Sequence, residues 1–222
     1  MPHGDLQWDV RLPQRPGAGA GASRDASVVV SSDSHGEESI RVPVRVARAL
    51  SSRRESGRLA PASRAELLHA IGEASRAEVR SRIEEMLNRR DYSCQELSQR
   101  LRRDGFSGPV AEEGVSWARD LGLVDDARYG AAFARAKAAC GWGPIKVSCE
   151  LARRGVEAES LPGWPDEFFS AEDLVERARA LLSRRRPTGR NDFQKAVRFL
   201  RSRGFPPGMC FDVAREVFDP RD

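Results

Sequence analysis

Apolar residues recur three or four positions apart throughout the chain after Ser63, and this is the spacing of one buried face of an α-helix. Six such stripes follow one another: Val79–Leu87, Leu97–Leu101, Val110–Leu121, Tyr129–Cys140, Leu174–Leu182 and Phe193–Leu200. Serine and glutamate three residues apart predict helix starts, because the hydroxyl and the carboxylate satisfy free amides of the first turn. These capping boxes are Ser63/Glu66, Ser75/Glu78 and Ser93/Glu96. The pattern predicts an all-α fold.

The same helix ending occurs three times along the chain. A leucine, three further residues, a glycine and an apolar residue make up Leu101–Phe106, Leu151–Val156 and Leu200–Phe205, so the pattern recurs about every 50 residues. Glycine provides the left-handed residue that ends a helix, and the apolar residue folds back on the last turn, as in a Schellman motif. We call these segments the helix stops. They predict tandem three-helix repeats.

The composition divides the chain into four segments. Residues 1–62 are rich in Gly, Ser, Pro and Arg and predict a disordered head, although a strand-like alternation runs from Ile40 to Val46. Residues 63–124 hold a leading helix and the first repeat, residues 125–169 the second repeat and residues 170–222 the third. Pro162 and Pro165 leave room only for a truncated third helix in the second repeat.

The formal net charge is +4 and the sequence pI is about 9.2, which favours anionic partners. The strong preference for arginine over lysine is equally consistent with a GC-rich genome. The four cysteines form no C-x-x-C pair, so we expect reduced and mostly buried thiols. No run of 18 apolar residues and no signal peptide is present, so we expect a cytoplasmic protein without a membrane segment.

The sequence offers little material for catalysis. Its histidines, His3, His35 and His69, lie in or beside the head, so no catalytic triad can be assembled from them. The carboxylates sit at helix caps or on polar faces without metal-ligand spacing, and no Walker loop is present. We therefore expect a protein that is not an enzyme and that uses no metal and no cofactor.

Arginines recur beside each helix stop. They are Arg102 and Arg103, then Arg153 and Arg154, then Arg201 and Arg203. A basic residue at the end of a helix also complements the helix dipole, and for any single arginine this structural role is the simpler interpretation. The recurrence in three repeats favours a binding surface for an acidic partner. Arg185, in the basic segment Ser183–Arg190, is equally consistent with a phosphate contact and with a solvated turn.

The segment Leu121–Val156, "LGLVDDARYGAAFARAKAACGWGPIKVSCELARRGV", resembles the RecX family of bacterial regulatory proteins. The resemblance rests on Leu-Gly-Leu before Asp125 and Asp126, on Tyr129 and Phe133, on the Gly143-Pro144 turn and on the helix stop. The flanking repeats are similar to that family as well. The resemblance implies an elongated, curved, all-helical array that binds the RecA filament and restrains its activities in recombinational repair and the SOS response. Repeat proteins of this kind close their cores without a partner copy, so a monomer is expected.

The resemblance also implies candidate contacts with the filament. These are the basic residues at the stops together with Arg128, Tyr129 and Lys146. Tyr129 lies on an apolar stripe, where a core position is the simpler interpretation, and Trp142 is expected to pack against its tight turn. A second hypothesis is a module that binds DNA directly, single-stranded DNA included, because three-helix units resemble helix-turn-helix bundles and the basic pI favours phosphate contacts.

Overall fold

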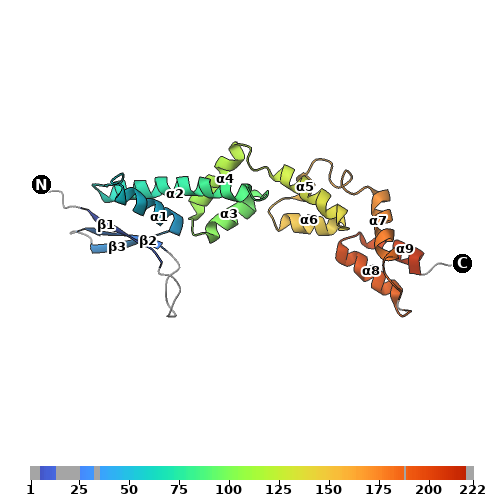
Figure 1. Cartoon of the computed structure of the whole chain (residues 1–222). Helices are drawn as coiled ribbons and strands as arrows, with labels where there is room; N and C mark the ends of the chain where they lie inside the picture. The colour runs from blue at the N-terminus through green and yellow to red at the C-terminus, as the bar shows by residue number, and fades with distance from the viewer. Residues whose placement is uncertain (1–5, 14–25, 33–35, 188, 219–222) are drawn as a thin grey trace. The chain divides into compact units, whose positions relative to one another are not determined.

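The computed structural model describes residues 6–13, 26–32, 36–187 and 189–218 (Figure 1). The chain divides into two compact units. The first unit contains Met1–Tyr92 and Glu96–Val124, and the second contains Ser93–Gln95 and Asp125–Asp222. Most of the described residues lie in helices, so the predicted helical fold is confirmed.

The described part of the head forms a small antiparallel sheet and a helix. Strand β2 (Ala26–Ser32) lies between β1 (Gln7–Arg11) and β3 (Gly36–Val42), and α1 (Val44–Glu55) contacts β1 and β2. Val28 is buried and pairs in register with Val10 on one side and Ile40 on the other. The prediction of a disordered head is therefore corrected for these residues. The segments 1–5, 14–25 and 33–35, which include the glycine-rich stretch, lie outside the described residues.

The first unit also contains α2 (Arg64–Leu87), α4 (Gly108–Asp120) and most of α3 (Cys94–Arg103), of which Cys94 and Gln95 belong to the second unit. Helix α2 packs against α1 and α4. A Cβ atom at Gly114 of α4 would lie 2.1 Å from a methyl carbon of Val79, so only glycine permits this close helix contact. The periodicity predicts a buried face beginning at Val79, and in the structure Val79 and Ile83 of this face contact α4.

The predicted helix starts have three different outcomes. The Ser63 side chain accepts a hydrogen bond from the Glu66 amide, which confirms that cap. The prediction at Ser75 is wrong, because α2 continues through it and its hydroxyl donates to the Ile71 carbonyl four residues earlier. Helix α3 begins at Cys94 after the predicted cap residue Ser93, whose hydroxyl donates to the Arg154 carbonyl at 2.6 Å.

The second unit contains α5 (Asp126–Ala139), α6 (Pro144–Ala152), the 3₁₀ helix η1 (Ala158–Ser160), α7 (Ala171–Ser183), α8 (Asp192–Arg203) and α9 (Pro207–Phe218). A single cluster of buried side chains, from Ala134 to Ala214, joins these helices. The short η1 stands where a truncated third helix was expected after the second helix stop. Proline at the start of α6 and α9 fits the first turn, where its missing amide costs nothing.

All three helix stops have the predicted backbone. Gly105, Gly155 and Gly204 have φ values of +95°, +75° and +86°. In each stop the apolar residue donates its amide hydrogen to the leucine carbonyl five residues earlier, at 3.0–3.2 Å, which is the Schellman hydrogen bond. The three leucines and the three apolar residues are all buried. The repeated sequence pattern therefore reports a repeated local structure.

Candidate partner-binding surface at the helix stops

Each stop glycine lies against the N-terminal end of a helix that precedes it in the chain. The nearest residues to a Cβ atom built on Gly105, Gly155 and Gly204 are Pro43, Gln95 and Lys146, which stand at or next to the starts of α1, α3 and α6. At the third stop two backbone hydrogen bonds form this contact. Gly143 donates to the Arg203 carbonyl at 2.8 Å, and Ile145 donates to the Gly204 carbonyl at 3.1 Å.

This docking uses carbonyl groups that a helix end leaves unpaired, and it pairs them with amides that a helix start leaves unpaired. At the second stop, side chains rather than backbone amides pair with the free carbonyl groups. The Ser93 hydroxyl donates to the Arg154 carbonyl, and the Gln95 amide nitrogen lies 3.5 Å from the Arg153 carbonyl. The backbone of the stops is thus used inside the protein. The arginine side chains extend from it toward solvent or toward neighbouring groups.

The arginines of the first stop differ in their surroundings. Arg102 is exposed and pairs with Glu112 of α4. Arg103 is also exposed, and within the described chain no carboxylate lies within ion-pair distance of it. A cation without an internal counter-charge keeps its full attraction for an external anion. Arg103 is therefore the better candidate contact of the two.

The second stop carries one exposed and one partly buried arginine. The Arg153 side chain is 78% exposed and lies 3.1 Å from the Glu150 carboxylate. The Arg154 side chain is only 26% exposed, pairs with the same carboxylate and lies over the Phe133 ring. Of the two arginines at this stop, Arg153 is exposed and Arg154 is partly buried. The pKa of Glu150 is lowered, chiefly by its hydrogen bond from Arg154.

The third stop and the basic loop before it meet at one aromatic ring. Arg185 lies 4.3 Å from the centre of the Phe199 ring, and Arg203 lies 5.3 Å from the same centre. Arg203 also donates to the Cys140 carbonyl. Arg201 is exposed. The structure thus brings Arg185 and Arg203 together, although 17 residues separate them in the sequence and only the stop motif marked Arg203.

The two candidates of the family motif lie at the start of α5. Arg128 is exposed, and Tyr129 is half-buried, packs against the core of the second unit and stacks on Phe133 with 6.3 Å between ring centres. This placement agrees with the core interpretation of Tyr129. Lys146 is half-buried on α6, with its ammonium group 4.3 Å from the centre of the Trp142 ring.

Aromatic rings between cations are the feature of the second unit that the sequence reasoning missed. The Phe133 ring contacts Arg154 and Lys137, and the Trp142 ring contacts Lys137 and Lys146. Each cation lies over a ring at 4.3–5.4 Å from its centre, within the range of a favourable cation–π interaction. Helical spacing of aromatic and basic residues on α5 and α6 was the available signal.

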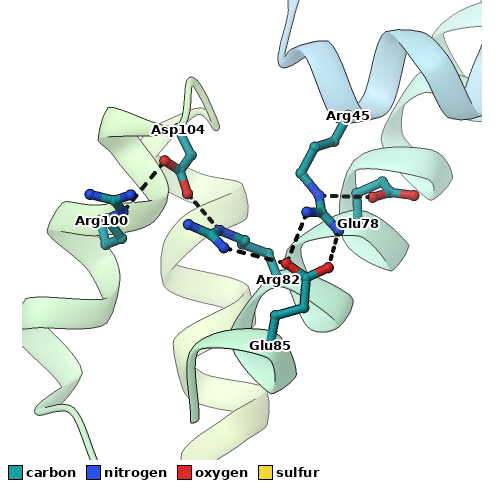
Figure 2. Close-up of polar contacts among 6 residues, drawn as sticks. All are labelled: Arg45, Glu78, Arg82, Glu85, Arg100 and Asp104. Carbon is teal, nitrogen blue, oxygen red and sulfur yellow. Dashed lines mark hydrogen bonds and ion pairs between the residues drawn. The ribbon is translucent and has the colours of Figure 1, made fainter. Parts of the chain in front are cut away.

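A polar network holds the first stop in place (Figure 2). Arg45, at the start of α1, donates to Glu85 at 2.7 and 3.0 Å and to Glu78 at 3.2 Å. Arg82, whose side chain is 13% exposed, donates to Glu85 at 3.3 Å and to Asp104 at 2.7 Å. The hydrogen bond from Arg45 lowers the pKa of Glu85, so this carboxylate stays ionised.

The described residues contain no group of three or more histidines, cysteines or carboxylates placed to hold a metal ion. None of the described helices combines the length and the apolar character needed to cross a membrane. The four cysteines, all among the described residues, form no disulfide; Cys210 is buried and Cys94 half-buried, whereas Cys140 and Cys149 are exposed. The expectation of mostly buried thiols is therefore wrong.

The fold and the stops define a class: a tandem helical-repeat protein with arginines at its helix stops. Residues 125–160 match the family model described as RecX, second three-helix domain. The regulatory protein RecX of Stenotrophomonas maltophilia is 33% identical over 141 residues, covering 62% of this chain and 84% of the relative. That of Halorhodospira halophila is 34% identical over 140 residues, covering 60% and 84%. The chain belongs to the RecX family of regulatory proteins.

Two crystal structures share the fold. RecX from Lactobacillus salivarius gives a TM-score of 0.56 at 17% identity and covers 64% of this chain and 96% of its own. A second structure, of regulatory protein RecX, gives a TM-score of 0.59 at 15% identity and covers 96% of this chain and 99% of its own. The relatives are named as regulatory proteins and not as enzymes, as the sequence analysis expected of this chain.

Proposed function

We propose that this protein binds the RecA nucleoprotein filament and restrains its ATPase, recombinase and coprotease activities. It would act in the cytoplasm, as a monomer, in DNA repair and the SOS response. Membership of the RecX family supports this proposal, because the resemblance implies a filament-binding regulator. The observation that carries it is the repeated helix stop, whose backbone is held internally while arginine side chains surround it.

The side chains that would contact the filament are those that remain available at the stops. Arg103, Arg153 and Arg201 are exposed and do not pack on a ring in the described structure. Their guanidinium groups suit carboxylates or phosphates, which a bidentate pair of donors recognises best. Arg154, Arg185, Lys146 and Arg203 lie over aromatic rings, so they would add charge with less freedom to reorient.

The test is DNA-dependent ATP hydrolysis by the cognate RecA, titrated with this protein. We expect inhibition at well below one molecule per RecA. The variant Arg153→Glu should weaken it, because a rim charge reversal opposes electrostatic association. Arg215→Glu, at an exposed arginine of α9, is the matched control and should inhibit like the wild type. Unchanged ATP hydrolysis with excess wild-type protein would refute the proposal.

A second candidate function is direct binding of DNA without RecA. The rings of Phe133, Trp142 and Phe199, each contacted by two cations, support it. Proteins that bind single strands combine a positive surface with aromatic side chains on which bases stack. Tight binding to a naked single strand, with no effect on RecA, would favour this candidate. The affinity should then fall steeply as salt is raised.

A further inference from the structure

A pocket rich in arginine lies in the first unit, away from the aromatic rings described above. Its volume is about 330 Å³, within the range of small-ligand sites. The C-terminal end of α2, the turn after it and one face of α3 form its wall. The lining residues are Arg82, Met86, Arg89, Arg90, Tyr92, Glu96, Gln99, Arg100 and Arg103.

The charges in this pocket are not balanced. Five arginines and one glutamate line it, and cations remain in excess when Glu85 and Asp104, which contact Arg82, are counted with them. Arg82 and Arg100 are held by the network around Asp104, and Arg90 pairs with Glu96. Arg89 and Arg103 are exposed, and no carboxylate of the described chain lies within ion-pair distance.

Collecting like charges in a concave site raises the local potential, and the protein gains from this arrangement only when an anion enters. The network in Figure 2 explains how the fold tolerates it: Glu85 and Asp104 pair with Arg82, and Asp104 also pairs with Arg100, which offsets part of the positive charge. Guanidinium groups directed at one site match a phosphate group, which accepts two parallel hydrogen bonds from each fork.

The wall also offers planar and polar groups beside the cations. The Arg90 guanidinium lies 3.6 Å from the centre of the Tyr92 ring, so an aromatic ring and a planar cation are stacked at the pocket. Gln99 adds an amide that can both donate and accept. Stacked planar groups bind nucleobases with little dependence on sequence.

We propose that this pocket binds a nucleotide, with the phosphate on Arg89 and Arg103 and the base against the Arg90–Tyr92 stack. Two sources supply this chemistry: a free nucleoside triphosphate and one nucleotide of a single strand. The pocket shares Arg103 with the proposed filament contacts, but nucleotide binding in it requires no RecA. Its test therefore uses no RecA, so its failure and the failure of the proposed function are distinguishable.

The test compares the full-length protein with the double variant Arg89→Gln/Arg103→Gln. Fluorescence anisotropy with a labelled oligothymidylate, and calorimetry with dTTP, measure the two sources separately. We expect the double variant to bind its ligand at least about tenfold more weakly, since two charge-assisted phosphate contacts are lost. For the oligothymidylate, the slope of log affinity against log salt should fall by about 1.4, or 0.7 for each contact on a single strand.

Two further variants distinguish a specific effect of the pocket on binding from a general effect of the protein's net charge. Arg119→Gln removes one exposed arginine of α4 that does not line the pocket, and it should bind like the wild type. Tyr92→Ala should weaken oligothymidylate binding about tenfold by removing the stacking ring. Circular dichroism of each variant measures whether the helical fold is retained. The substituted arginines are exposed, so their replacement should leave the fold intact.

Binding of dTTP that depends on Arg89 and Arg103 would identify a free nucleotide as the ligand. Binding of oligothymidylate alone, with the same dependence, would identify a strand. Either result supports the pocket. Equal affinities of the wild type and the folded double variant for both probes, or no binding of either probe, would overturn it.

Discussion

The contact between the third helix stop and the start of α6 should be sensitive to a single methyl group. Gly204 has φ +86°, and a Cβ atom there would lie 2.4 Å from the Lys146 amide nitrogen and 2.9 Å from its Cα atom. These are backbone atoms, so no side-chain rotation relieves the clash. Gly204→Ala should separate α6 from α8 and break the hydrogen bonds from Gly143 and Ile145.

The magnitude follows from three contributions. A left-handed backbone costs an L-residue roughly 1–2 kcal/mol, and a loss of unfolded-chain entropy offsets about 0.4–1 kcal/mol of this. Two backbone hydrogen bonds contribute about 1 kcal/mol each to stability. We therefore expect Gly204→Ala to lower the free energy of unfolding by about 3 kcal/mol, with any residual repulsion adding to it.

Gly105→Ala is the matched control, because it removes the same motif glycine at φ +95°. Its Cβ atom would meet Pro43 at 3.7 Å, an ordinary contact, so only the backbone cost of about 1 kcal/mol remains. Urea denaturation followed by far-ultraviolet circular dichroism measures both variants. Equal losses of stability in the two variants would show that the docking contact contributes nothing, and the reasoning would fail.

Three further outcomes follow from individual side chains. Arg154→Glu should destabilise the protein by about 1–2 kcal/mol in the same denaturation assay, because it places a second carboxylate beside Glu150 and removes the contact with Phe133. By contrast, Arg153→Glu should change the stability by less than about 0.5 kcal/mol. The lowered pKa of Glu150 provides stability that is complete above about pH 4.5 and is lost as the pH falls through the folded-state pKa. In the variant Glu150→Gln, the free energy of unfolding should therefore depend less on pH below about pH 4.5. The exposed thiols of Cys140 and Cys149 should react quickly with a thiol reagent in the native protein. Cys210 should react only on unfolding, because it is buried and its burial raises the pKa of the thiol. Equal rates for all three would contradict the core position of Cys210.

The sequence predicts the helix stops well because their cause is local. Glycine at the left-handed position and an apolar residue after it determine the Schellman geometry within six residues, and all three stops have it. The helix start at Ser75 was predicted from an equally local signal and is wrong. There the hydrophobic face of α2 continues on both sides of Ser75, and packing against α1 and α4 outweighs the capping preference.

The head shows what a local pattern cannot reveal. The segment Ala26–Ser32 contains only three valines in succession between serines, and such a strand is stable only within a sheet of three or more strands or against a helix. Its partners come from Gln7–Arg11 and Gly36–Val42, and α1 covers the sheet, so the stability comes from contacts distant in sequence. Composition therefore suggested disorder where the described residues form a sheet.

The candidate site shows the same difference between features set by local sequence and features set by contacts distant in sequence. The stop motif identified Arg103, Arg153 and Arg201, which are exposed. It gave no indication that Arg154 lies on Phe133 or that Arg185 and Arg203 share Phe199, since these contacts join separate helices. The pocket around Arg89 was missed for the same reason: its lining comes from two helices and the turn between them.

The docking of the stops also reveals the relationship of the head to the repeats. Gly155 and Gly204 lie against residues at the starts of α3 and α6, each the middle helix of a repeat, and Gly105 lies against Pro43, just before α1. The residues that the three glycines contact, Pro43, Gln95 and Lys146, recur at about the spacing of the stops themselves. Helix α1 therefore occupies the place that the middle helix of a preceding repeat would take. A helical repeat leaves its outermost face without a neighbour, and a terminal unit must cover it. The sheet and α1 provide that cover for the first repeat, which explains why the motif glycine Gly105 meets a proline there instead of another repeat.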